Sequence, residues 1–308
     1  MITSYNNRSV REVIQLAQKA KARSKEGLFV AEGIKMFEEA PPRRIEKVYI
    51  SERMEKELYE RYDKKLNQLL CEIVADDVFL KMSDTKTPQG ILCLVRQFKY
   101  NIEDMLAGKC HSKAAGMSIV MNTQTGSGEN ADGVPKAAAN SMKADSKDVN
   151  PGGQNKKQML FIVLENIQDP GNLGTIFRVG EAAGVDGIIM SRQTVDIYNP
   201  KTIRSTMGSV YRVPFLYTDD LCGAVRMMKA REIDVYAAHL HAERYYDEYD
   251  YRRSCAFLIG NEANGLSQEA AECAGAYLKI PMKGKVESLN AAVASSILLY
   301  EAYRQRRH

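Results

Sequence analysis

The sequence predicts an α/β fold, with a mostly parallel C-terminal sheet covered by helices on both faces and a small N-terminal α/β domain. Three observations predict it. The second half of the chain alternates short apolar runs with helical stretches, the order typical of parallel sheets. Its first run, Met159 to Leu164, is apolar at every position, as in a strand buried on both faces. Residues 108–157 are rich in Gly, Ala, Ser, Asn and Lys and lack aromatic residues. We therefore expect domains over 1–107 and 158–308, joined by a flexible linker over 108–157.

In the N-terminal part, the stretch from Arg8 to Ala22 has apolar residues at i, i+3, i+4 and i+7, which predicts an amphipathic helix. Glu52 to Leu70 is expected to form a charged helix. Four short apolar runs are expected to form strands: Leu28 to Ala31, Val48 to Ile50, Ile73 to Ala75 and Ile91 to Val95.

In the C-terminal part, we expect a helix from Leu173 that ends at Gly184, a residue typical of helix C-termini. Asn199 and Pro200 have the residue types that begin a helix, expected to run through Met207. A long helix is expected at the end of the chain, from Ser288 to Arg304. The remaining expected elements are strands at Gly187 to Met190, Val213 to Leu216, Val235 to Ala238, Ala256 to Ile259 and Ala276 to Ile280, and helices at Asp219 to Arg231 and Ser267 to Ala274.

Composition restricts the class of protein. The 308 residues are 44% hydrophobic and 27% charged, as in ordinary globular proteins. No run of about 18 apolar residues is present, which argues against a membrane span, and the N-terminus lacks the apolar core of a secretory signal, so we expect a cytoplasmic protein. The six cysteines and four histidines show no metal-ligand spacing, so we expect buried free thiols and no metal.

The charge pattern favours a polyanionic partner. The net charge is +4, and a basic run near the N-terminus contains Lys19, Lys21, Arg23 and Lys25. Such a run is either a solvated helix face or a contact for RNA, and charge alone does not decide between them.

Three polar loops follow predicted strands, at the edge where parallel sheets bind ligands. The first, after Leu164, contains Asn172 and, six residues later, Arg178. The second runs from Gly260 to Ser267 in the form G-x-E-x-x-G and includes Glu262. Its glycines allow a close backbone approach to a ligand, but it is not the G-x-G-x-x-G pattern of a dinucleotide site.

The third loop, after Ile280, places Ser288 and Asn290 at the start of the last helix, where free N–H groups bind ligands. Each loop taken alone is also explained by helix capping.

In their order along the chain, the three motifs resemble the SpoU/TrmH branch of the SPOUT RNA methyltransferases. The motifs are N-x-x-D-P-x-N-x-G-x-x-x-R, G-x-E-x-x-G-L-S and I-P-M-x-G-x-x-x-S-L-N-x-x-V-A, over Met159 to Arg304. The N-terminal KAKARSKEGLFVAEG and TKTPQG resemble that family's small ribosomal-protein-like RNA-binding domain, which favours RNA as the partner of Lys19, Lys21, Arg23 and Lys25. Ala291-Ala292 replaces the Val-Ser common in relatives, and the linker is longer than usual.

The resemblance implies a deep trefoil knot, a homodimer with active sites at its interface, and S-adenosylmethionine as methyl donor. It implies methyl transfer to a ribose 2′-hydroxyl, with a guanosine in 23S ribosomal RNA as the expected target. Carried over by motif position, the residues at the cofactor would be Gly260, Asn261, Ile280, Met282 and Leu289, and the catalytic group would be Asn172, Arg178, Glu262, Ser288 and Asn290.

Arg178 corresponds to the arginine that the family uses in catalysis. As a general base it would have to lose a proton at a cost of about 7 kcal/mol at pH 7. An electrostatic role, in which it binds the adjacent phosphate and stabilises the developing alkoxide, is less demanding.

Other functions remain open at this point. They are a transfer RNA 2′-O-methyltransferase, a catalytically silent RNA-binding protein on the same scaffold, a base methyltransferase of another SPOUT branch and a nucleotide-dependent oxidoreductase. The missing dinucleotide fingerprint disfavours the oxidoreductase, and the pairs Asn172/Arg178 and Ser288/Asn290 favour ribose over base.

Overall fold

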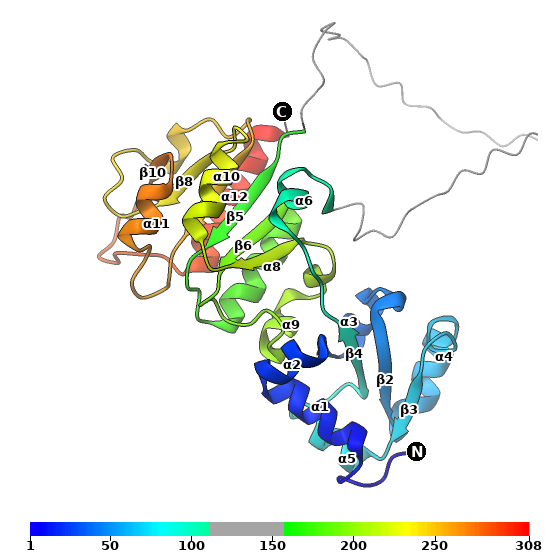
Figure 1. The fold of residues 1–308 in the computed structure, drawn as a ribbon. Coiled ribbons are helices and arrows are strands. Elements are labelled where there is room, and N and C mark those ends of the chain that lie inside the picture. The colour runs from blue at the N-terminus through cyan, green and yellow to red at the C-terminus, as the bar shows by residue number, and fades with distance from the viewer. Residues whose placement is uncertain (111–156, 308) are drawn as a thin grey trace, which may run out of the picture.

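The computed structural model describes residues 1–110 and 157–307. Almost all of the predicted linker lies outside these residues. The described chain forms two α/β domains, each built on its own sheet (Figure 1).

The N-terminal sheet is mixed, with strand order β1-β4-β2-β3. Strand β4 pairs antiparallel with β1 and β2, and β2 pairs parallel with β3. The strands are β1 (Leu28–Glu32), β2 (Ile45–Ser51), β3 (Cys71–Val74) and β4 (Ile91–Arg96), and the helices are α1 (Arg8–Gln18), α2 (Ala20–Glu26), α3 (Ile34–Glu39), α4 (Glu55–Leu66) and α5 (Asp76–Met82), with short 3-10 turns at Pro42–Arg44 and Glu52–Met54.

The predicted single helix from Arg8 to Ala22 is wrong in one respect, because it is broken at Lys19. The backbone of Lys19 is extended (φ −121°, ψ 113°), so α2 starts in a new direction. The predicted helix from Glu52 to Leu70 is also shorter than expected, since α4 ends at Leu66.

The C-terminal sheet has six strands, all parallel, in the order β10-β8-β9-β5-β6-β7. This confirms the predicted parallel sheet. The strands are β5 (Leu160–Leu164), β6 (Gly187–Ser191), β7 (Phe215–Thr218), β8 (Asp234–Ala238), β9 (Cys255–Ile259) and β10 (Ala276–Leu278), and the helices are α8 (Pro170–Ala183), α9 (Pro200–Thr206), α10 (Leu221–Lys229), α11 (Gln268–Cys273) and α12 (Ala291–Arg306), with 3-10 turns at Ser209–Tyr211 and Tyr246–Glu248.

Helix α6 (Ile102–Leu106) belongs by its contacts to the C-terminal domain. Met105 and Leu106 are buried in the same hydrophobic cluster as Met159 and Phe161. A Cβ on Gly187 would lie 2.5 Å from the Met105 sulfur, so β6 needs glycine where this helix packs. The chain therefore enters the C-terminal domain before residue 107, where the sequence had placed the domain boundary.

The two domains pack directly against each other. The Phe29 ring on β1 lies 4.7 Å from the Tyr198 ring, centroid to centroid, and the backbone N–H of Phe98 donates to the Tyr198 hydroxyl (2.8 Å). Arg212 forms ion pairs with Glu39 of α3 and Glu181 of α8. Aromatic packing and charge pairing thus fix how the N-terminal domain sits on the C-terminal domain.

The expectation that all cysteines are free thiols is wrong for one pair. Cys222 of α10 and Cys273 of α11 form a disulfide between two helices that pack side by side. Among the described residues, Cys71, Cys93 and Cys255 are free thiols. The described part of the chain has no group of three or more His, Cys, Asp or Glu residues placed to hold a metal ion. Nor does any described helix have the length and apolarity to cross a membrane.

Candidate active site

The three polar loops meet at the carboxyl edge of the C-terminal sheet. The Asn172 side chain donates through Nδ2 to Glu262 Oε1 (2.8 Å) and accepts through Oδ1 from Asn290 Nδ2 (2.8 Å). Glu262 lies 90 positions and Asn290 lies 118 positions after Asn172 in the chain. One amide therefore joins the second and third loops, as the sequence predicted.

The Glu262 carboxylate accepts three hydrogen bonds. Besides Asn172, its carboxylate accepts from the backbone N–H groups of Gln168 (3.1 Å) and Asp169 (3.3 Å). Burial raises the pKa of Glu262, but the bonds from Asn172 and from backbone N–H groups outweigh it, so this pKa lies below its usual value. The charged carboxylate holds the start of the first loop against the second.

Local sequence sets the two helix ends at this edge. The Asp169 side chain accepts from the Asn172 N–H (2.8 Å) and Pro170 follows at the first helical position, so α8 begins at Pro170, with residues 165–169 between it and β5. Asn290 caps α12, because its Oδ1 accepts from the N–H groups of Ala292 and Val293. Asn290 thus serves both as a helix cap and as a partner of Asn172.

The second loop requires glycine and asparagine for its shape. A Cβ on Gly260 would lie 2.2 Å from the carbonyl carbon of Gly265, so the two backbone segments meet only if residue 260 is glycine. Asn261 and Gly265 exchange backbone hydrogen bonds (2.9 Å each), and Asn261 Nδ2 donates to the Asn166 carbonyl (2.7 Å). Asn261 therefore fastens this turn to the first loop.

Sequence reasoning missed two residues that hold these loops. Buried Glu165 accepts from the Ser267 N–H (2.7 Å) and hydroxyl (2.6 Å), which fixes the end of the second loop. Asn166 has a positive φ of 56° and accepts from the Ser191 hydroxyl (2.8 Å). Their position directly after an apolar strand is the signal that would have marked Glu165 and Asn166.

Arg178 and Ser288 are not joined to this group. Both are exposed, and within the described residues neither forms a hydrogen bond or ion pair with Asn172, Glu262 or Asn290. Arg178 lies on α8, two turns beyond its first residue, and α8 packs against α12. The structure thus brings together three of the five predicted catalytic residues within one chain.

The predicted cofactor residues surround the same edge. Ile280, Met282 and Leu289 are partly buried apolar side chains on the third loop, and Ile280 packs against the hydrophobic cluster that includes Ile259 at the end of β9. Apolar side chains beside exposed backbone are the kind of lining that an adenine ring and a methionine chain require.

Of the four basic residues predicted to bind RNA, Arg23 is not available for RNA contact. Its side chain is buried, with the guanidinium bonded to Asp196 Oδ2 (2.6 and 2.9 Å) and to the carbonyls of Leu16 and Ala17. The break at Lys19 turns Arg23 towards the other domain. Lys19, Lys21 and Lys25 are exposed.

Two family models match the chain. The model of the SpoU rRNA Methylase family matches residues 159–300, the stretch that carries all three loops. The C-terminal domain belongs to the SpoU rRNA methylase family. The model of the MRM3-like substrate binding domain matches residues 7–93, which form the N-terminal sheet and its helices.

Curated relatives share the SpoU domain. The chain is 37% identical over 139 residues to the 23S rRNA (guanosine(2553)-2'-O)-methyltransferase RlmP of Bacillus subtilis, which covers 45% of this chain and 56% of that protein. It is 35% identical over 147 residues to the 23S rRNA (guanosine-2'-O-)-methyltransferase RlmB of Bordetella pertussis, covering 48% and 60%. The chain thus spans less than two thirds of the length of these relatives.

Solved structures with the SpoU fold match both domains. An AdoMet-bound rRNA methyltransferase from Sinorhizobium meliloti is 27% identical, with a TM-score of 0.72, over 98% of this chain and 97% of that one. The SpoU methyltransferase AviRb from Streptomyces viridochromogenes, solved with AdoMet, has a TM-score of 0.74 at 21% identity over 98% and 99%, which shows the shared fold alone.

Proposed function

We propose that this protein transfers a methyl group from S-adenosylmethionine to a ribose 2′-hydroxyl of ribosomal RNA. The observation that carries the proposal is the bonded series Glu262–Asn172–Asn290, which brings the three loops of the SpoU domain together beside a half-buried apolar lining. Relatives that share this domain are named as 23S rRNA 2′-O-methyltransferases.

The residues present fit the cofactor. The turn at Gly260 and Asn261 and the side chains of Ile280, Met282 and Leu289 would hold it, with Asn261 kept in place by its bond to the first loop. When bound, S-adenosylmethionine supplies an electrophilic methyl group. The protein must then hold the ribose so that the 2′-oxygen faces that methyl in line.

The polar group would orient the ribose. Asn172 has both amide atoms engaged by protein, which fixes its plane and therefore the position of α8 at the site. Ser288 lies exposed two residues before Asn290 and offers a hydroxyl to the ribose. Arg178 would bind the adjacent phosphate and stabilise negative charge on the 2′-oxygen, a role that needs no proton loss.

A second copy of the chain would place Arg178. Three exposed apolar side chains, Val293, Tyr300 and Tyr303, lie at i, i+7 and i+10 on α12 and so share one face. This face and the adjoining α8 are suited to a symmetric dimer contact, which would bring Arg178 of one protomer to the site of its partner. Light scattering should report a dimer, and Tyr300→Asp should weaken it.

The proposal also specifies which RNA and which nucleotide are methylated. The relatives named above act on guanosine in 23S rRNA, so we propose a guanosine of 23S rRNA as the substrate. A transfer RNA substrate is the alternative, and the test distinguishes the two.

Transfer of tritium from labelled S-adenosylmethionine to unmodified 23S rRNA or to bulk tRNA tests the proposal. We expect label in 23S rRNA, in nucleotides that resist alkaline hydrolysis, because a 2′-O-methyl group blocks attack by the 2′-oxygen. Asn172→Ala should lower the rate, and Asn67→Ala, an exposed asparagine at the end of α4, should not. Label in tRNA alone would show that the substrate is transfer RNA and not 23S rRNA. Cofactor binding without any transfer would support the catalytically silent alternative.

A further inference from the structure

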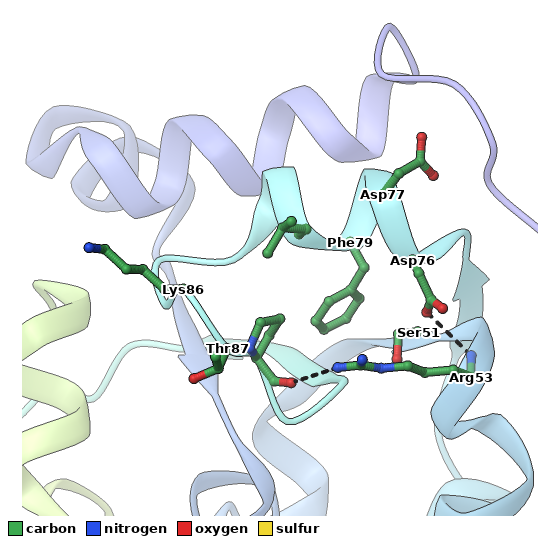
Figure 2. A pocket seen from close by; sticks show the side chains of 9 residues that line it. Ser51, Arg53, Asp76, Asp77, Phe79, Lys86 and Thr87 are labelled. Atoms are coloured by element: carbon green, nitrogen blue, oxygen red, sulfur yellow. Dashed lines mark hydrogen bonds between the residues drawn. The ribbon is translucent and has the colours of Figure 1, made fainter.

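A pocket in the N-terminal domain lies apart from the candidate active site. It has a volume of about 350 Å³ and is formed by the end of β2, the first turns of α5 and the loop before β4. Figure 2 shows Ser51, Arg53 and Phe79 around its interior, with Lys86 and Thr87 on the loop side. None of the predicted catalytic or cofactor residues lines it, and Lys86, Thr87 and Pro88 belong to the TKTPQG motif. Its volume is that of an ordinary small-ligand site.

Ser51 supplies the main sign that the pocket takes a ligand. The residue is 2% exposed, and within the described part of the chain its Oγ has no hydrogen-bond partner. A buried hydroxyl without a partner is energetically costly. Gly90 packs directly against this hydroxyl, since a Cβ there would lie 2.5 Å from Ser51 Oγ. A ligand atom that bonds to Ser51 would remove this cost.

The charges around the pocket favour a nucleobase over a phosphate. Arg53 and Lys86 are cationic, but Asp76 lies on the same wall and accepts from the Arg53 N–H (3.3 Å), while the Asp77 carboxylate points outward in Figure 2. A carboxylate beside the cations opposes an anion. This combination of cations and a carboxylate favours an aromatic base that offers hydrogen-bond acceptors on one edge and hydrogen-bond donors on another.

Guanine has this distribution of polar groups. Its O6 and N7 accept from arginine or lysine, and its N1–H and N2–H groups donate to a carboxylate such as that of Asp76. The apolar side chains of Phe79, Leu80 and Pro88 provide a wall for the ring. Arg53 is positioned by a bond from Nη2 to the Pro88 carbonyl (3.3 Å), which uses one of its five N–H donors.

We infer that this pocket binds one unstacked guanine base of the RNA substrate, at a nucleotide other than the one methylated. Proteins read single-stranded RNA by accommodating splayed bases in this way. The inference rests on the proposed function, since it assigns the pocket to the same RNA.

The pocket loop is also tied to the active-site edge. Asp84, two residues before Lys86, pairs with Arg204 of α9 (2.8 Å). One turn earlier on α9, Lys201 lies 3.7 Å from Asp169, the cap of α8. A Cβ on Gly174 would lie 2.3 Å from Ser205 Cβ, so α8 and α9 pack closely. A base held in the pocket would therefore fix the RNA relative to Asn172.

Fluorescence anisotropy of the full chain with labelled RNA heptamers tests the inference. The probes are U7 and U3-X-U3, where X is guanosine, adenosine or an abasic site. We expect the guanosine probe to bind about tenfold more tightly than the abasic one, which is about 1.4 kcal/mol and within the range for a bidentate base contact. Ser51→Ala and Arg53→Gln should each remove most of this preference. Lys56→Gln, an exposed cation on α4 outside the pocket, should keep it.

Equal affinity of the wild-type chain for all four probes would overturn the inference, as would a guanosine preference that survives Arg53→Gln. Competition by inorganic phosphate that abolishes the preference would indicate an anion site instead. Calorimetry of S-adenosylmethionine on the same samples keeps the two proposals separate. If the wild-type chain does not bind the cofactor, the proposed methyl transfer is contradicted and the heptamer result stays valid. A variant that loses cofactor binding is judged misfolded, and Ser51→Cys then takes its place.

Discussion

Replacing Glu262 by glutamine should destabilise the loop junction and flatten its pH response. The carboxylate accepts three hydrogen bonds on two oxygens, from Asn172 Nδ2 and from the N–H groups of Gln168 and Asp169. In Glu262→Gln one oxygen becomes an NH₂ donor that faces a donor, so at least one bond is lost. A bond to a charged acceptor contributes about 1.5–3 kcal/mol, and because water reaches this half-buried group we expect a loss of about 1–2 kcal/mol.

The sign of the pH effect follows from the lowered pKa of Glu262. Since the folded pKa lies below the unfolded one, the charged form stabilises the fold fully above about pH 4.5, and this contribution is lost as the pH falls through the folded pKa. The wild type should therefore lose more stability than Glu262→Gln over that acidic interval.

Urea unfolding at fixed protein concentration, at pH 7 and in steps below pH 5, measures both effects. Glu243→Gln provides the matched control, because Glu243 is exposed on the loop after β8. If Glu262→Gln unfolds at the wild-type urea midpoint at pH 7 and follows the same acid profile, the carboxylate does not hold the loops together and this reasoning fails.

Three further predictions follow from other contacts. Arg178→Ala should keep S-adenosylmethionine binding but lose methyl transfer, and an unchanged tritium rate would remove Arg178 from the mechanism. Arg23→Ala should lower the free energy of unfolding by about 3 kcal/mol, because it leaves Asp196 without its buried partner; urea unfolding beside Lys21→Ala, an exposed neighbour, measures this, and equal losses would contradict it. Reducing the disulfide between helices α10 and α11, which closes a loop with a separation of 51 residues, should cost up to about 4 kcal/mol; a melting temperature that reductant leaves unchanged would refute this.

Much of the fold could be predicted because local signals and burial agree in the C-terminal domain. Asn199-Pro200 and Gly184 mark helix ends by their own side chains and backbone, and the structure confirms both, whereas α8 begins at Pro170, three residues before the predicted Leu173. The meeting of the three loops was predictable as well, because the carboxyl ends of parallel strands share one edge.

What could not be predicted depends on contacts between distant segments. The charge of Arg23 does not reveal that a break at Lys19 turns the side chain towards Asp196. Nothing local distinguishes Cys222 and Cys273 from the other cysteines, because their pairing needs two helices to pack. The trefoil knot and the dimer, which only the resemblance implied, stay predictions.

The packing of α6 has a consequence for how this protein tolerates changes in length. Cys110 and Met159, on either side of residues 111–156, are buried in one hydrophobic cluster of the C-terminal domain. The residues on both sides of the intervening segment are therefore anchored on the same domain, and the placement of the N-terminal domain on the C-terminal domain does not depend on that segment. Changes in the number of residues between Cys110 and Met159 should therefore leave the packing of the two domains unchanged.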